Sequence, residues 1–167
     1  YALSANVENL TLTGTSAING TGNGLDNVLA GNSAANRLTG GAGNDTYIIG
    51  AGDTVVEAVN AGIDTVQSSV THTLAANVEN LNLIGTAAIN GTGNTLNNIL
   101  VGNSAVNTLT GGAGDDMYVV GAGDTVVEAV NAGTDTVQSL VTWTLGVNLE
   151  NLTLAGTAAI NGTGNTL

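Results

Sequence analysis

Residues 38–50 read LTGGAGNDTYIIG, and this stretch decides the fold. It opens with an apolar residue, any residue and a glycine, and it continues as a Gly-rich segment that ends at Asp45. Gly and Asn tolerate positive φ angles, so residues 40–45 are predicted to form a tight turn. Thr46–Ile49 follow with the β-branched and aromatic composition of a strand. The stretch therefore predicts a turn that leads directly into a short β-strand.

The same stretch returns as LTGGAGDDMYVVG at 109–121. When residues 6–76 are set against 77–147, 53 of the 71 positions are identical without a gap. Residues 148–167 begin a third copy, and residues 1–5 match the end of a preceding one. Self-similarity at a fixed long period is typical of repeat architectures. We therefore expect 71-residue tandem repeats, and we expect the chain to be a window from a longer array.

A shorter rhythm of an apolar residue, any residue and Gly recurs within each copy and separates units of roughly 9–11 residues, which are too short for βαβ crossovers. No segment has a sustained helical period, and residues 57–61 are the best candidate for a single helical turn. Two units, near 19 residues, would make one coil that rises about 4.8 Å, the spacing of neighbouring strands. The prediction is an all-β, parallel, β-roll-like solenoid of roughly eight or nine coils over residues 1–167. A β-sandwich is disfavoured because its cores would contain no Phe.

The charge balance narrows the set of partners. The chain has one Lys or Arg against 13 acidic residues, so its formal net charge is −12. Binding to nucleic acid is excluded as a natural function because phosphate contacts need a basic surface. No apolar run reaches the length of a membrane span, so no membrane insertion is expected. A chain this acidic either repels itself or holds cations.

Residues for catalysis are missing from the pattern. His72 is the only histidine, and Trp143 takes its place in the second copy. The chain has no Cys, and no Ser has a His–Asp neighbourhood that both copies keep. The Gly-rich turns lack the Lys of a phosphate-binding loop. We therefore predict that the chain is not an enzyme.

Two segments fit the nonapeptide G-G-x-G-x-D-x-U-x at every fixed position, Gly40–Ile48 and Gly111–Val119. On these segments the chain resembles the RTX, or hemolysin-type calcium-binding, family. The stretches around them, such as residues 6–14, resemble the spacer repeats of long secreted RTX proteins. The resemblance implies calcium as the ligand, ion sites formed between turns stacked on successive coils, and folding outside a bacterial cell at millimolar calcium.

The candidate ligands follow from this stacking. Ca²⁺ takes six to eight oxygen ligands from carboxylates and carbonyls. Asp26, Asp45 and Asp64 are evenly spaced along the chain, one coil apart by the estimate above, so we expect an ion between the turn that ends at Asp45 and residues 60–64. The alternative is that these acids only make solvent-exposed Asx-turns. The predicted metal-site residues are Gly41, Gly43, Asp45 and Asp64, their repeats Gly112, Gly114, Asp116 and Asp135, and, with a weaker claim on the opposite edge, Asp53 and Asp124.

Two questions stay open at this level. Glu79 and its repeats lie in a strand-like stretch where alternation would place them beside leucines, so either a bulge turns them outward or they are buried with partners. For function, we expect a calcium-stabilised extracellular rod of a surface protein, adhesin or filament, whose partners are calcium and further copies of itself. The alternatives are a secretion and folding module attached to a secreted enzyme, and a ligand-binding adhesin module.

Overall fold

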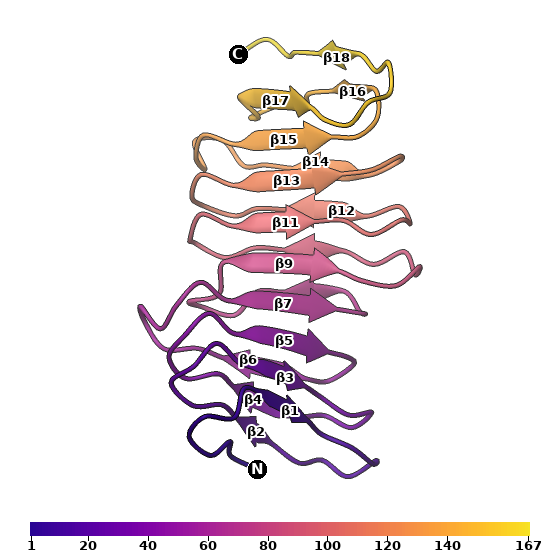
Figure 1. Ribbon diagram of the computed structural model, residues 1–167. Coiled ribbons are helices and arrows are strands. Elements are labelled where there is room, and N and C mark those ends of the chain that lie inside the picture. The colour runs from indigo at the N-terminus through magenta and orange to yellow at the C-terminus, as the bar shows by residue number, and fades with distance from the viewer.

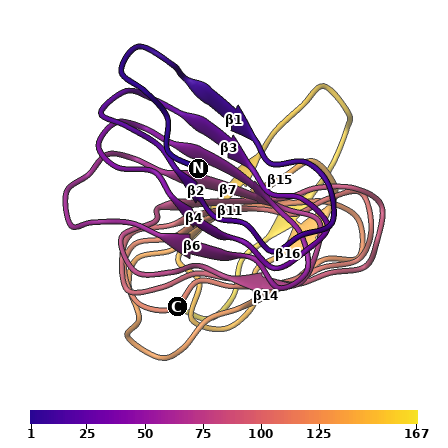
Figure 2. The same ribbon diagram turned by 90° about the horizontal axis from the view of Figure 1, so that it is seen from below.

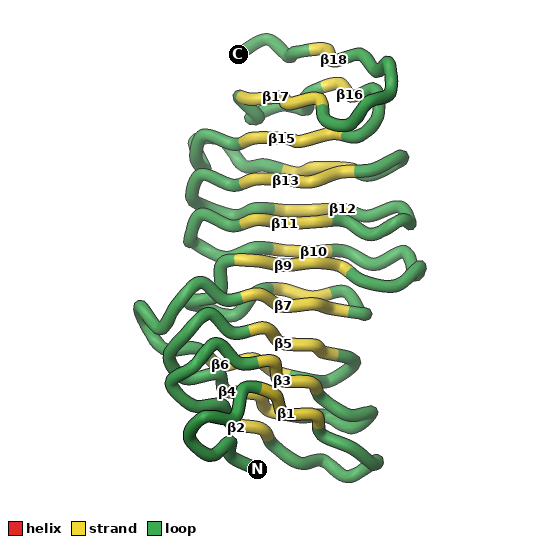
Figure 3. The backbone as a smooth tube through the Cα atoms, in the orientation of Figure 1, coloured by secondary structure: helices red, strands yellow, loops and turns green.

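The computed structural model describes all residues 1–167 as a parallel β-solenoid without a helix. Figure 1 shows the coils stacked from the N-terminus at one end to the C-terminus at the other, and Figure 3 shows short strands joined by turns throughout. The predicted all-β solenoid is confirmed. No helix that could cross a membrane is found. The predicted helical turn at residues 57–61 is wrong, because this segment forms an open turn after a strand.

One face of the solenoid is a continuous sheet of nine strands in which every neighbour pair is parallel. Each coil contributes one of its strands, so the molecule has nine coils, as the coil estimate predicted. These strands are β1 (Asn9–Thr11), β3 (Val28–Ala30), β5 (Thr46–Ile49), β7 (Thr65–Ser68), β9 (Asn80–Leu83), β11 (Ile99–Val101), β13 (Met117–Val120), β15 (Thr136–Ser139) and β17 (Asn151–Leu154).

The opposite face carries the second strand of each coil, but this second sheet is interrupted. It breaks between β6 and β8 and again between β14 and β16. Its three parts are β2 (Gly20–Thr21), β4 (Arg37–Thr39) and β6 (Thr54–Val56); β8 (His72–Thr73), β10 (Gly91–Thr92), β12 (Thr108–Thr110) and β14 (Thr125–Val127); and β16 (Trp143–Thr144) with β18 (Gly162–Thr163).

The coils are not equal in length. Along the nine-stranded sheet, the numbers of paired positions differ by 19 from β1 to β3, by 18 to β5, by 19 to β7 and by only 15 to β9. The same four offsets follow in the same order from β9 to β17. One sequence repeat therefore occupies four whole coils and eight strands. The count of about seven units from the sequence is one short, because β8 and its repeat are very short strands that carry no glycine signal.

The unequal coils also correct the predicted stacking of acids. The register pairs Val28 with Thr46, so Asn27 lies above Asp45, and Asp26 lies one position outside that column. Asn27 is buried, and Asp26 is exposed. The prediction that Asp26, Asp45 and Asp64 stack is therefore wrong for Asp26, because a uniform coil length is one residue too long at this level.

The core is a narrow apolar column between the two sheets. Inward side chains of successive strands lie in register, and Tyr47 and Tyr118 are the fully buried aromatics. The stack also twists, since the first strands cross β15 at an angle when the rod is seen from below (Figure 2). The buried members of the central column are Leu10, Leu29, Tyr47, Val66, Leu81, Leu100, Tyr118 and Val137.

Candidate metal centre

The nonapeptide turn lies between β4 and β5, and its glycines have the backbone conformation that the motif requires. Gly41 and Gly43 have φ values of 116° and 110°, where an L-residue is strained. The turn stacks on the next one along the rod, because the Gly43 amide donates to the Ala61 carbonyl at 2.8 Å and the Ile63 amide donates to Asn44 Oδ1 at 2.8 Å. The two turns predicted to enclose a site are therefore in contact.

The repeat of this turn has the same geometry. Gly112 and Gly114 both have a φ of 113°. The Gly114 amide donates to the Ala132 carbonyl at 2.8 Å, and the Thr134 amide donates to Asp115 Oδ1 at 2.8 Å. Both copies thus hold a nonapeptide turn against the turn of the following coil.

A ladder of carboxylates runs along the inside of this edge. The amide of Asn27 donates to Asp45 Oδ1 at 2.7 Å, the amide of Asp45 to Asp64 Oδ1 at 2.8 Å, and the amide of Asp64 to Glu79 Oε2 at 2.8 Å. Each acid therefore uses one oxygen to bind the coil before it. This answers the question left open for Glu79, which is half-buried and caps a backbone amide.

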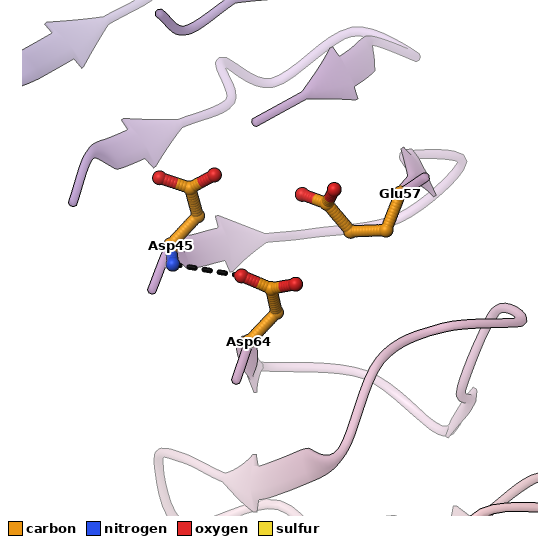
Figure 4. Close-up of side chains that lie close together, drawn as sticks. All are labelled: Asp45, Glu57 and Asp64. Atoms are coloured by element: carbon orange, nitrogen blue, oxygen red, sulfur yellow. Dashed lines mark hydrogen bonds between the residues drawn. The ribbon is translucent and has the colours of Figure 1, made fainter. Parts of the chain in front are cut away.

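The second oxygens of the two aspartates have no such partner. Asp45 Oδ2 and Asp64 Oδ2 are buried and accept no hydrogen bond, although the two residues are only 1% and 0% exposed. The buried Glu57 reaches them from the far side of the coil, where it follows β6 (Figure 4). One ligand oxygen of each of the three acids lies within 4.8 Å of the others. Three elements thus converge on a small interior space lined with oxygen atoms.

Glu57 is itself held in place. The Tyr47 hydroxyl donates to its Oε1, and the Ala58 amide donates to its Oε2 at 3.2 Å. Gly40 closes the space from above, since a Cβ at this position would lie 2.0 Å from Asp45 Oδ2 and 2.2 Å from the Tyr47 hydroxyl oxygen. Only a glycine fits there, so the first glycine of the nonapeptide forms one wall of the cluster.

The second copy reproduces the arrangement with Asp116, Glu128 and Asp135. Asp116 Oδ2 and Asp135 Oδ2 are again buried without a partner. The Tyr118 hydroxyl donates to Glu128 Oε1, and the Gly111 amide donates to the same oxygen at 3.0 Å. Recurrence at an independent position indicates that the sequence, not a chance rotamer, places these groups.

The electrostatics of the cluster favour a bound positive charge. Burial is the main cause that raises the pKa of Asp45 to about 6, of Glu57 to about 7 and of Asp116 to about 7, and the neighbouring acids raise each value further. Burial likewise raises the pKa of Asp64 and Asp135. The chain has a single basic side chain, and Arg37 is exposed and bonded to Thr39. Above neutral pH the cluster is a buried, uncompensated anion, which fits a hard divalent cation.

Asp53 and Asp124, the weaker candidates, lie in the turn after β5 and β13 on the opposite edge and are not part of either cluster. Both oxygens of Asp53 accept backbone bonds, from the Asn36 amide at 2.8 Å and the Gly50 amide at 2.8 Å. Asp124 does the same with Asn107 at 2.9 Å and Gly121 at 2.7 Å. These two carboxylates close a turn with their charged oxygens fully used.

Sequence reasoning misses three participants. It places Glu57 in a helical turn, treats Tyr47 only as a large apolar residue, and omits Gly40 from the site. A signal for Glu57 is present, because both copies keep an acid directly after the same Thr-Val-Val strand. The histidine position agrees with its non-catalytic interpretation, since His72 is half-buried in β8 with its Nε2 unpartnered, and burial lowers its pKa.

A comparison with protein families agrees with this geometry. The family described as the RTX calcium-binding nonapeptide repeat (4 copies) matches residues 21–56 and 92–127. The chain contains RTX calcium-binding repeats. No curated protein and no solved structure matches it. An RTX-repeat solenoid is a structural, non-catalytic type of module that binds calcium. The matched segments contain Asp45 and Asp116 but end at Val56 and Val127, directly before Glu57 and Glu128.

Proposed function

We propose that this chain is a non-catalytic extracellular module, a β-solenoid rod whose coils are held together by calcium. The observation that carries the proposal is the pair of buried, unpartnered carboxylate oxygens in each cluster, Asp45 with Asp64 and Asp116 with Asp135. A buried anionic oxygen without a partner costs several kcal/mol, and a cation removes that cost. Calcium is the hard, oxygen-seeking ion that the RTX repeats bind.

The proposal assigns different roles to the predicted ligands. Asp45 and Asp64 hold the first ion and Asp116 and Asp135 the second, while Gly41, Gly43, Gly112 and Gly114 shape the turns around them. Asp53 and Asp124 act as backbone caps, because their oxygens are already occupied. Repeats 6–76 and 77–147 then each carry one ion, in equivalent positions along the rod.

A calcium titration followed by far-UV circular dichroism tests the function. In chelator at pH 7.5 we expect a largely unordered spectrum, because the net charge of −12 and two uncompensated clusters oppose compaction. Calcium should induce the β-spectrum with a midpoint of roughly 10⁻⁴–10⁻³ M, the range of extracellular sites. Terbium luminescence sensitised through Tyr47 and Tyr118 would locate the ion beside these phenols. A full β-spectrum in chelator that calcium does not change would refute the proposal.

Matched variants separate ligands from caps. Asp45→Asn with Asp116→Asn should abolish the calcium-dependent transition in the millimolar range. Asp53→Asn with Asp124→Asn is the control, since it removes the same formal charge from carboxylates that accept only backbone bonds. We expect the control to lower the unfolding free energy by about 1–2 kcal/mol per site and to leave calcium affinity unchanged. Equal loss of calcium affinity in both variants would contradict the assignment.

The rod form also supports a role in assembly, as part of an adhesin, surface layer or filament outside a bacterial cell. β1 and β17 each have a neighbour on one side only, and exposed strand edges pair with further strands. We expect head-to-tail association of this chain in calcium, seen as a concentration-dependent sedimentation coefficient. Sedimentation of a monomer at every concentration in saturating calcium would remove self-assembly from the proposal and leave the calcium module intact.

A further inference from the structure

The break in the second sheet lies beside the carboxylate cluster. Between β6 and β8 the backbone ladder of this sheet stops, whereas β5, β7 and β9 remain paired on the other face. The shortest coil, from β7 to β9, falls here, and the chain leaves β6 through Glu57 into an exposed turn that contains Val59. The rod is therefore continuous on one side and open on the other at this level, and again between β14 and β16.

Glu57 belongs to both sides of this break. Its carbonyl accepts a hydrogen bond from the Asn77 side chain at 3.0 Å, which spans the break from the following coil. Its carboxylate points the other way, into the interior, where it faces Asp45 and Asp64 from the opposite edge of the coil (Figure 4). The second copy repeats the bond from Asn148 to the Glu128 carbonyl at 3.0 Å.

The two aspartates, in contrast, belong to the continuous side. Each directly precedes a strand of the nine-stranded sheet, β5 or β7, and each is tied to its neighbour by the carboxylate ladder. A cation bound by their free oxygens alone would only reinforce a side that is already paired. A cation that also contacts Glu57 would connect the paired side with the interrupted side across the interior.

We propose that Glu57 and Glu128 are the third carboxylate ligands of the two calcium sites, and that through them each ion locks the adjacent break in the second sheet. The inference rests on the proposed function and extends it to residues that the RTX match does not include. The unpartnered Asp45 and Asp64 oxygens, fully enclosed beside Glu57, are the independent sign that a ligand belongs in this space. The rod then has one calcium-locked joint every four coils.

Spin labels at equivalent positions test the joint. The chain has no cysteine, so Thr21→Cys with Thr92→Cys, and Thr92→Cys with Thr163→Cys, give two label pairs that are each one sequence repeat and four coils apart. Thr21 and Thr92 span the first break, and Thr92 and Thr163 span the second. In saturating calcium, Glu57→Gln should broaden the distance distribution of the first pair about twofold and leave the second pair unchanged. Glu128→Gln should do the reverse.

Calcium affinity provides the second readout. Glu57→Gln keeps the size of the side chain and an acceptor for Tyr47 but removes the charge, so affinity at the first site should fall by about tenfold or more, with the second site unaffected. Glu57→Asp, which keeps the charge but shortens the side chain, should lie between Glu57→Gln and the unmodified chain. Unchanged affinity and unchanged distances in Glu57→Gln would overturn this inference, while calcium-dependent folding would still support the proposed function. Absence of calcium binding in the unmodified chain would overturn both.

A measurement without a charge change covers a variant that does not fold. The pair Thr73→Cys with Val127→Cys lies within the uninterrupted part from β8 to β14. At partial calcium saturation of the otherwise unmodified chain, the pair that spans the first break should broaden before this internal pair does. Simultaneous broadening of both pairs would contradict a joint at the break.

Discussion

Gly40→Ala is expected to eliminate calcium binding in the first repeat and to lower the free energy of unfolding by about 3 kcal/mol. The added methyl would lie 2.0 Å from Asp45 Oδ2, 2.2 Å from the Tyr47 hydroxyl oxygen and 2.4 Å from Glu57 Oε1. These three atoms belong to buried side chains that cannot move outward, so the methyl takes the space that the cation needs. Calorimetric titration with calcium, together with thermal unfolding in calcium, measures both effects.

Gly24→Ala is the matched control for this substitution. Gly24 lies in a turn on the same edge, and a Cβ there meets nothing within 4 Å. The second copy itself carries Thr95 at the equivalent position, so a side chain is tolerated. We expect a change in unfolding free energy within about 0.5 kcal/mol and unaltered calcium binding. If Gly40→Ala behaved like Gly24→Ala, the cluster would not be the ion site.

The pH dependence of stability is expected to reverse its sign when calcium is added. In chelator, the folded chain binds more protons than the unfolded chain between pH 4, where an unfolded Asp titrates, and pH 6–7, the raised pKa values of Asp45, Glu57 and Asp116. Stability is therefore lost as the pH rises through this window. From pH 5 to 7.5 we expect a loss on the order of 3–5 kcal/mol, or roughly 10 °C in Tm.

Calcium replaces the protons, so in saturating calcium the stability should increase over the same pH range. The lowered pKa of His72 acts in the opposite direction in chelator, because the unfolded histidine gains a proton below its ordinary pKa. His72→Trp, which copies Trp143 of the second repeat, removes this contribution. Thermal melts at pH 5 and 7.5 with and without calcium give the four values required. Stability that rises with pH in chelator would show that the clusters do not carry the raised pKa values.

The sequence is informative about local structure for a physical reason. Turn residues, β-branched strands and repeat spacing are local properties, and they are sufficient to predict a parallel solenoid of about nine coils. The stacking of Asp45 on Asp64 also follows from spacing, because both acids directly precede a strand. Aligning each coil at the residue before its strand would also place Asn27 and Glu79 correctly in the ladder.

The inward reach of Glu57 cannot be predicted in this way. Glu57 follows Asp45 by more than half a coil along the chain and meets it only across the width of the interior. That contact depends on where the second sheet breaks and on how the chain leaves β6, which are long-range properties of the stack. The same holds for Gly40, whose role depends on side chains that arrive from β5 and from the turn after β6.

The four-coil length of the sequence repeat has a consequence for how such a chain can change in evolution. Since one repeat brings the strand path back to the same sheet in the same register, β1, β9 and β17 begin at equivalent residues. Recombination between copies in the gene would then add or remove four coils without a frameshift in the stacking and without turning an ion site to another face. A repeat unit that ended partway round a coil would disrupt every coil after it. Rod length can thus vary in steps of about 19 Å, four strand spacings, while every lateral surface keeps its composition.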